Sequence, residues 1–579
     1  MRRFQSLSLL LCTAGGLWAQ MTPEQRSFDF EVLTSLYAKR YAPYQWKRDA
    51  LNADLYNLSS WRDRVRKASS DLEYYEIAME YVAAFQDTHS HYRMPTSFSA
   101  DLGLFTDIYD GKVLIDGINR AVLPLSRYPF QVGDEVVSID GVSSEDIIAS
   151  NSKYYRWGNP DTTRRYAAYF IPYRPQTIVP RAVELGDTAS VVIRRAGGDL
   201  ETYTILWNKT GLGLTNIGPV PSPAPAATSI AKRRTAREEA PDYMRPLLDM
   251  QNWTVPEWTN MYRGEIEDDA GNVTPRYAIS LGNRSPNFRL PANFVQRLGR
   301  SASDFQFSGT YESGGYKIGY LRVPSFSPPS TAIRELDTEI DYLQKNTDGL
   351  VLDVMQNPGG GCYMADLAAR FMPGKFYFFG EQVRPTMDRI LSAQSALDTA
   401  KALRAEQWVI DTYQFLLGML QDAYKNNRGL TGAYPACNQT GSNVPPSLDQ
   451  WPAATVYSKP IIILVDAFSI SAADIFPAMM QDNKRGVVVG MRTSGGGGSV
   501  SSWPAGFYSE ATTSNTNSLV IRNQNIVTAE YPPAPYVENI GTRPDIKLDY
   551  MTRENLMNGG TAFVSQFTNI IIDQIKKGQ

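Results

Sequence analysis

The sequence predicts an α/β protein in which a parallel sheet forms the main core, accompanied by a smaller β domain and an N-terminal helical region. From about Tyr316 onward, strand-like and helix-like runs alternate, which is typical of parallel βαβ units. Between about Gly103 and Trp207, short β-like runs are separated by turn signals. From Pro23 to about Phe85, apolar residues recur at helical spacing.

The elements of the core can be placed from these patterns, because short apolar runs bounded by turn residues predict strands and longer amphipathic runs predict helices. We expect strands at 316–323, 349–354, 460–465 and 486–490, and helices at 330–344, 364–371 and 471–481, with a long helical insertion near 387–427. The expected domains are a helical region at 21–98, a β domain at 99–210, a linker at 211–245 and the core at 246–579.

The N-terminus has the pattern of an export signal. Two arginines precede an apolar stretch from Leu7 to Trp18, which is too short to span a bilayer, and Ala19 offers a small residue for cleavage. We therefore expect residues 1–20 to be a signal peptide and the mature chain to be periplasmic or extracellular. No later segment has the roughly 18 apolar residues of a membrane helix. The formal net charge of −3 gives no reason to expect nucleic acid as a partner.

The expected linker is rich in proline and alanine over residues 219–227, and a basic cluster follows at 232–234. Such a cluster is either a solvated part of the linker or a processing site, since exposed chain tips attract proteolysis.

Cys362 and Cys437 remain after removal of a signal peptide, so a single disulfide is one option in an oxidising compartment. Their pairing stays open.

The two histidines of the chain, His89 and His91, both lie in the run 85–92. Histidine is the side chain whose ordinary pKa is nearest neutrality, so one of them could be a general base. Both could instead be packed or surface residues. If the run is extended, Asp87, His89 and His91 share a face and could start a metal site, but no further histidine exists to complete it, and the two remaining cysteines lack a tight metal-binding spacing.

A serine opens the helix that follows the expected strand at 460–465. Unpaired backbone amides and the positive end of the dipole collect at a helix N-terminus and stabilise a developing oxyanion, so Ser471 is well placed to be a nucleophile. The rival interpretation is structural, because Ser471 with Asp474 three residues later forms a capping box. The sequence alone does not decide between a nucleophile and a helix cap.

The sequence also contains two glycine-rich turns. The first, at 357–361, leads from the strand at 349–354 into a helix, and its three glycines allow backbone amides to turn toward a ligand or an oxyanion. A plain tight turn is the alternative. The second, at 493–499, contains four consecutive glycines but lacks the lysine of a P-loop, so nucleotide binding is not expected.

From about residue 100 onward, a series of short segments forms a recognisable pattern: 133–141, 318–326, 352–360, 469–476, 481–482 and 487–493. In this order, the segments resemble those of the C-terminal processing, or tail-specific, serine proteases. The resemblance implies a crotonase-like protease core with a PDZ-like domain and no cofactor or metal. By motif, Ser471 takes the place of the nucleophile, Ala472 supplies an oxyanion-hole amide, and Gly359 and Gly360 supply the second donor.

One departure from the family pattern is the general base. Many members pair the serine with a lysine shortly after the Val-Gly-x-x-Thr stretch, but here that position is Gly496. Lys484 and Arg492 lie nearby in the sequence without matching it. Either the chain is a catalytically inactive relative, or another base serves Ser471.

The chain is similar to the branch of this family represented by the chlamydial protease-like activity factor, in which the base is a histidine in an Asp-x-His segment and a glutamate follows the serine. The matching residues are His89 and Glu538. His89 would take the proton of Ser471, and Glu538 would orient the imidazole directly or through water. His91 receives no role, and Asp482 either orients a neighbour or is a solvated helix residue. The branch also implies a self-inhibitory segment, which the linker could mimic.

We therefore expect an exported serine endopeptidase whose PDZ-like domain aids substrate capture or regulation. Its partners would be protein or peptide substrates, and a homodimer is one possible assembly; no nucleic acid and no membrane span are expected. Activity should fall in weak acid as the imidazole of His89 protonates. The alternative is a catalytically inactive peptide- or ligand-binding protein on the same scaffold.

Overall fold

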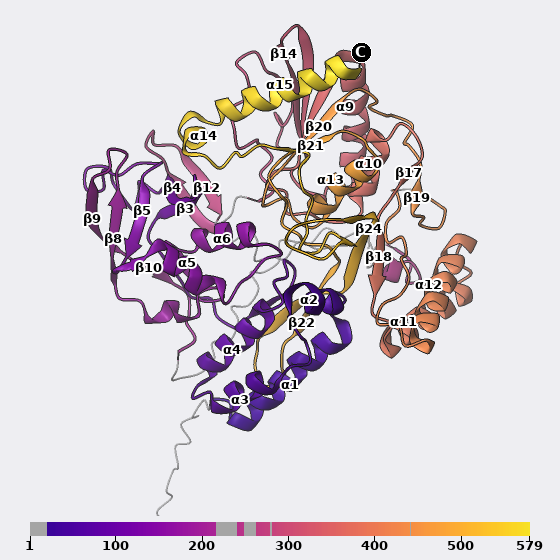
Figure 1. Ribbon diagram of the computed structural model, residues 1–579, viewed down its shortest axis with the longest axis horizontal. Helices are drawn as coiled ribbons and strands as arrows, with labels where there is room; N and C mark the ends of the chain where they lie inside the picture. The colour runs from indigo at the N-terminus through magenta and orange to yellow at the C-terminus, as the bar shows by residue number, and fades with distance from the viewer. Residues whose placement is uncertain (1–19, 216–239, 248–261, 278–280, 440–441, 579) are drawn as a thin grey trace, which may run out of the picture.

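The computed structural model describes residues 20–215, 240–247, 262–277, 281–439 and 442–578 (Figure 1). The expected signal peptide, apart from Gln20, and most of the expected linker lie outside these residues. The predicted fold class is confirmed: the chain has a mixed α/β core, a separate β domain and an N-terminal group of helices. In Figure 1 the N-terminal helices, in indigo, lie below the core, and the β domain lies to its left.

The core is a seven-stranded sheet in which the strands from β15 to β26 run parallel and an antiparallel pair completes one edge. All five residues of β20 are buried aliphatics, as is typical of a parallel strand that is covered on both faces. In sheet order, the strands are β13 (Val295–Leu298), β14 (Phe307–Ser313), β15 (Tyr316–Arg322), β16 (Gly349–Asp353), β20 (Ile461–Val465), β21 (Val487–Gly490) and β26 (Ile546–Lys547).

Helices cover both faces of this sheet. On one face lie α9 (Ala332–Asn346), α10 (Tyr363–Phe371) and α13 (Ala472–Asp482), and on the other lies α15 (Thr561–Gly578), which follows the short α14 (Arg553–Asn558). The turns that leave the neighbouring strands β16 and β20 enter α10 and α13. Because these strands are parallel, both turns lie at the same edge of the sheet, where α/β proteins place their sites.

The β domain is built on an antiparallel sheet in the order β3-β4-β5-β8-β9, with β6 beside β5. A small sheet, β10-β2-β7, extends it. The elements are β2 (Ser99–Asp101), β3 (Leu104–Tyr109), β4 (Lys112–Ile118), β5 (Glu135–Ile139), β6 (Val142–Ser143), α5 (Ser144–Ser152), α6 (Pro160–Tyr169), β7 (Tyr173–Pro175), the 3₁₀ helix Pro180–Glu184, β8 (Thr188–Arg194), β9 (Leu200–Leu206) and β10 (Asn208–Thr210).

The N-terminal helices pack through a core rich in tyrosine and phenylalanine. The strand that follows them, β1 (His91–Arg93), pairs with β23 (Thr512–Thr516), which in turn pairs with β22 (Val500–Pro504). This pairing brings the histidine segment against the C-terminal part of the chain. The helices are α1 (Pro23–Arg40), α2 (Tyr44–Leu51), α3 (Ser59–Lys67) and α4 (Asp71–Ala83).

The expected helical insertion is a pair of helices, α11 (Met387–Ala402) and α12 (Gln407–Lys425), at the right of Figure 1. Cys362 and Cys437 form a disulfide, which ties the start of α10 to the segment that follows α12. The remaining strands are β11 (Tyr262–Glu267), β12 (Val273–Tyr277), β17 (Phe376–Tyr377), β18 (Gly380–Val383), β19 (Asp449–Gln450), β24 (Ser518–Ile526) and β25 (Ala534–Tyr536).

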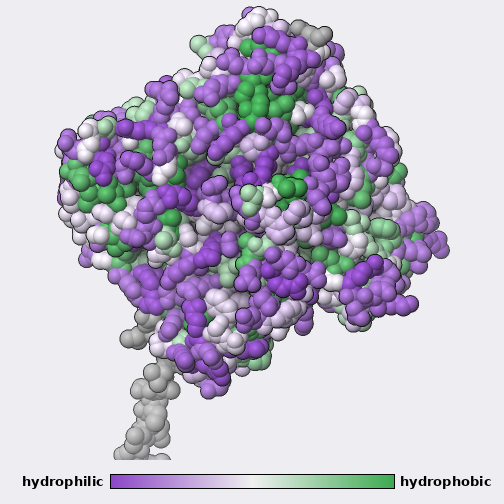
Figure 2. Space-filling model, in the orientation of Figure 1, coloured by the Kyte–Doolittle hydropathy of each residue, from purple (hydrophilic) through white to green (hydrophobic). Residues whose placement is uncertain are grey.

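Hydrophilic residues cover most of the face in Figure 2, and apolar residues show there in separate patches. None of the helices within the described ranges is both long and apolar enough to cross a membrane.

Candidate active site

Ser471 sits at the sharp turn between β20 and α13, with φ 58° and ψ −116°. A helix cap normally has extended φ and ψ values, and a positive φ is costly for a residue with a side chain. A strained serine between a strand and a helix is the arrangement that exposes the nucleophile in other hydrolases. Asp474 accepts the Ser471 backbone N–H at 2.7 Å, so the capping role exists as well, but it does not account for this conformation.

The glycine turn after β16 lies directly against Ser471. A Cβ added at Gly359 would lie 2.7 Å from Ser471 Cβ, so only glycine allows this approach. The Gly359 N–H donates to Asn357 Oδ1 at 2.8 Å and is therefore occupied. Among the hydrogen bonds of the described residues, the N–H groups of Gly360 and Ala472 have no acceptor. The turn thus offers Gly360, rather than Gly359, as a donor to pair with Ala472.

Asp474 connects the nucleophile turn to the second glycine loop. Its buried carboxylate accepts hydrogen bonds from the backbone N–H groups of Ser471, Gly495 and Gly496 and from the Ser494 hydroxyl, at 2.7 to 3.1 Å. Burial raises the pKa of Asp474 to about 6, against the opposing effect of these hydrogen bonds. One side chain therefore fixes both segments, a role that the capping-box pattern did not reveal.

Gly496, where the family pattern places a lysine, faces the histidine segment. A Cβ added at Gly496 would lie 3.3 Å from His89 Cε1 and 3.1 Å from Thr88 Cβ. The imidazole of His89 thus stands where a side chain at position 496 would begin. Asp474 binds both Ser471 and this loop, and His89 lies against Gly496 of the same loop. No hydrogen bond joins the His89 ring to Ser471 Oγ within the described part of the chain. Catalytic hydrogen bonds often tighten only when substrate binds.

Gly496→Ala should therefore lower activity, because the new methyl group pushes against two buried residues, one of which is His89. We expect a fall in kcat/KM of about 10-fold or more, as small misplacements of reacting groups are costly. Steady-state hydrolysis of a casein substrate measures it. Gly374→Ala is the matched control, since no atom of the described residues lies within 4 Å of a Cβ at that position. A Gly496→Ala enzyme as active as the control would contradict this placement of His89.

The backbone of His89 is held by hydrogen bonds, whereas its buried ring forms none with the described residues. Its N–H donates to Asp87 Oδ1 at 2.8 Å, and its carbonyl accepts the Ser514 hydroxyl at 2.7 Å. The ring atom Nδ1 is buried and has no hydrogen-bond partner among the described residues. Burial lowers the pKa of His89, and the nearby Lys47 lowers it further, whereas Asp87 opposes the shift. The imidazole is therefore neutral at neutral pH, as a general base requires.

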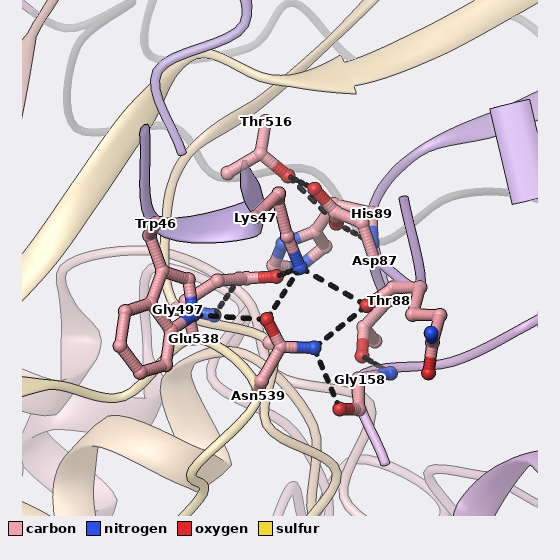
Figure 3. Close-up of polar contacts among 12 residues, drawn as sticks. Trp46, Lys47, Asp87, Thr88, His89, Gly158, Gly497, Thr516, Glu538 and Asn539 are labelled. Carbon is pink, nitrogen blue, oxygen red and sulfur yellow. Dashed lines mark hydrogen bonds and ion pairs between the residues drawn. The ribbon is translucent and has the colours of Figure 1, made fainter. Parts of the chain in front are cut away.

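Glu538 is buried close to His89, and its carboxylate is bound to a lysine (Figure 3). Its Oε1 pairs with the Lys47 ammonium, and its Oε2 accepts the Gly497 N–H at 3.0 Å. No direct hydrogen bond joins Glu538 to His89 in the described residues. Burial raises the pKa of Glu538 to about 7, and the Asp87 carboxylate adds to this, while Lys47 opposes it. Lys47 is 491 residues from Glu538 in the sequence, and no motif marks it.

His91 is packed rather than poised for chemistry. Its ring stacks on Tyr155 with centroids 4.6 Å apart, and its Nε2 lies 2.7 Å from the Thr88 carbonyl oxygen. Burial lowers its pKa to about 3. No group of three or more His, Cys, Asp or Glu side chains in the described ranges is arranged to hold a metal ion. These contacts favour the packed interpretation for His91.

The other candidates from the sequence lie outside this cluster. The side chain of Asp482 is buried in an ion pair with Arg522, so it orients a neighbour and the solvated interpretation is wrong, but that neighbour is not one of the candidate site residues. Lys484 is exposed at the far end of α13. Arg492 donates to the carbonyl oxygens of Asn539 and Ile540 and holds the chain around Glu538. No cation from this part of the sequence serves Ser471.

Comparison with known proteins places this geometry in a family. The model of peptidase family S41 matches residues 317–548, and that of a PDZ domain matches residues 100–211. The chain is a serine peptidase of family S41 with a PDZ domain. Ser471, the two glycine turns and Glu538 lie inside the first match, whereas Lys47 and His89 lie outside both.

Relatives of this S41 peptidase include a protein of Chlamydia trachomatis serovar D, 22% identical over 94% of this chain and 92% of the relative. A protein of Chlamydia pneumoniae is 20% identical over 98% and 93%. The carboxyl-terminal-processing protease of a Picosynechococcus strain is 25% identical over 32% and 31%. Among solved structures, mature CPAF superposes with a TM-score of 0.72 at 18% identity over 96% of this chain and 98% of CPAF, which shows a shared fold.

Proposed function

We propose that this S41 peptidase is an exported endopeptidase that cleaves peptide bonds with Ser471 as nucleophile, His89 as general base and Glu538 as the group that orients the base. His89 takes the Ser471 proton as the hydroxyl attacks the peptide carbonyl, and later gives a proton to the leaving amine. The N–H groups of Ala472 and Gly360 stabilise the oxyanion, with Gly359 providing the close approach to Ser471.

The observation that carries this proposal is the position of His89 against Gly496. A missing lysine by itself fits an inactive relative equally well. Here, however, Gly496, which stands where the family has the lysine, faces the His89 imidazole, and burial keeps that imidazole neutral. Asp474 also joins the loop of Gly496 to the strained turn of Ser471. A scaffold that only bound peptides would require none of these arrangements.

Glu538 acts on His89 through a bridging water in this proposal. The His89 Nδ1 atom is buried without a hydrogen-bond partner among the described residues, and such an atom usually has an ordered water. A water between Nδ1 and the Glu538 carboxylate would set the tautomer in which Nε2 faces Ser471.

Export and the role of the PDZ domain extend the proposal. The N-terminal sequence pattern and the Cys362–Cys437 disulfide both favour an oxidising compartment. PDZ domains bind extended peptides by adding a strand to a sheet edge, so the domain at 100–211 would capture substrate chains or regulate access to the site. The proposed partners are protein or peptide substrates, and homodimer formation stays a prediction.

Labelling with a fluorophosphonate tests the central claim, because only an activated serine reacts. We expect the purified, folded protein to be labelled on a single peptide containing Ser471, and Ser471→Ala to abolish labelling. Lactacystin, which is complexed with mature CPAF in a solved structure, is a second probe that should compete for the same site. A folded protein that neither probe modifies, before and after limited proteolysis of the linker, would instead be a noncatalytic peptide- or ligand-binding protein.

A further inference from the structure

Lys47, on α2, is buried at the centre of the cluster that surrounds His89 (Figure 3). Neither its side chain nor that of Glu538 has any exposed surface. The ammonium forms an ion pair with Glu538 and donates to Asn539 Oδ1 at 2.7 Å and to the Gln86 carbonyl oxygen at 3.0 Å. A lysine is rarely buried in this way unless a specific negative group holds it, so its contacts indicate a role beyond packing.

The charges around Lys47 show what that role is. Two buried carboxylates, Asp87 and Glu538, face this region together with the neutral ring of His89, and the phenol of Tyr41 lies beside both carboxylates. Lys47 is the cation that interacts with both of them. Without it, two like charges would share one dry site, and one carboxylate would retain a proton at neutral pH.

Glu538 is the carboxylate that would be protonated. Asp87 accepts the His89 backbone N–H and the Thr516 hydroxyl, and these donors stabilise its charge independently of Lys47. Glu538 has the Gly497 N–H as its other donor. The ionised state of Glu538 therefore depends on Lys47 more than that of Asp87 does.

We propose that Lys47 is a positioning residue that favours the ionised form of Glu538, in which Glu538 accepts rather than donates a hydrogen bond on the Nδ1 side of His89. The inference rests on the proposed Ser471, His89 and Glu538 mechanism. A protonated Glu538 would donate toward Nδ1 and favour the tautomer whose Nε2 carries the proton, which cannot accept one from Ser471. The α2 helix is thus part of the catalytic machinery, through one side chain.

The pH dependence of fluorophosphonate labelling tests this role, because it reports the activation of Ser471 without a defined substrate. In wild type the labelling rate should rise with pH as Glu538 ionises. In Lys47→Met this rise should move upward by roughly 1–3 pH units, the effect of removing an adjacent opposite charge, and the rate should recover in alkaline solution. Glu538→Gln, which cannot ionise, should stay slow throughout and lack this rise.

Controls separate a tuning role from a structural one. Lys47→Arg, which keeps the charge, should keep the wild-type midpoint, and Lys39→Met, at an exposed lysine on α1, should behave as wild type. Circular dichroism establishes that each variant is folded; if Lys47→Met is not, Lys47→Gln and Lys47→Arg provide the comparison. If folded Lys47→Met or Lys47→Gln is labelled more slowly than wild type by the same factor at every pH, the inference is overturned.

The inference and the proposed function fail in different ways. If His89→Ala and Glu538→Gln are labelled as fast as wild type, the proposed mechanism itself is wrong. If both are slow while the charge-removing variant of Lys47 keeps the wild-type pH midpoint, the mechanism stands and only the role of Lys47 is wrong.

Discussion

Ser471→Ala and His89→Ala should each lower kcat/KM for peptide hydrolysis by roughly 10⁴-fold or more, because removal of the nucleophile or its base from a triad leaves only binding and oxyanion stabilisation. The two effects should not add in the double variant, since both residues act in the same step. Steady-state assays on a casein substrate, with fluorophosphonate labelling of active sites, measure the loss.

His91→Ala is the informative comparison for His89. The ring of His91 packs on Tyr155 and bonds to Thr88, so its removal should lower the free energy of unfolding by about 2 kcal/mol or more, as for other buried rings, while most of the turnover remains. Chemical denaturation measures the first quantity and the peptide assay the second. Equal loss of activity in both histidine variants, with the fold retained, would break the assignment of His89 as the base.

Asp474→Asn should lower kcat/KM on the order of 10²-fold, the scale expected when reacting groups move by about 1 Å. The carboxylate accepts four hydrogen bonds from two segments, and an amide has only one oxygen. Its NH₂ group would face backbone N–H groups of the nucleophile turn or the glycine loop. Those segments would separate, and Ser471 would move relative to His89.

The size of this effect depends on the ionised form of Asp474. Burial raises the pKa of Asp474 to about 6, so the carboxylate is charged at neutral pH and takes up a proton below that value. Wild type in weak acid should therefore approach the Asn variant. Asp341→Asn, at an exposed residue of α9, is the control and should leave kcat/KM unchanged. An Asp474→Asn enzyme with wild-type kcat/KM at neutral pH would show that this carboxylate does not position the site.

Periodic patterns were sufficient for the core. The expected strand at 460–465 is β20 from Ile461 to Val465, and the expected helix at 471–481 is α13 from Ala472 to Asp482. The buried aliphatic run and the serine-initiated amphipathic run are local signals, and the tertiary contacts agree with them. The pairing of Cys362 with Cys437, which the sequence left open, depends instead on how the segment after α12 returns to the start of α10.

The contacts around the site were not predictable in the same way. The capping-box pattern predicted that Asp474 would pair with Ser471 at the start of the helix. The bonds that Asp474 accepts from Ser494, Gly495 and Gly496 exist only because two loops meet at one sheet edge. The glycine turn offered two candidate donors, and the bond from the Gly359 N–H to Asn357 leaves Gly360 as the free one. Such choices depend on backbone directions that composition does not encode.

The sequence by itself determined the α/β core, the β domain and the candidate Ser471, because local periodicity and short motifs carry those signals. The family resemblance then selected His89 of the two histidines and added Glu538. Only the tertiary structure decided that His89 faces the position left empty by Gly496, that His91 is packed, and that Lys47 stands between the N-terminal helices and Glu538. The physical reason is that His89 and Gly496, like Lys47 and Glu538, are hundreds of positions apart in the chain, so their charges and distances exist only once β1 has paired with β23 and α2 has packed against the C-terminal segment.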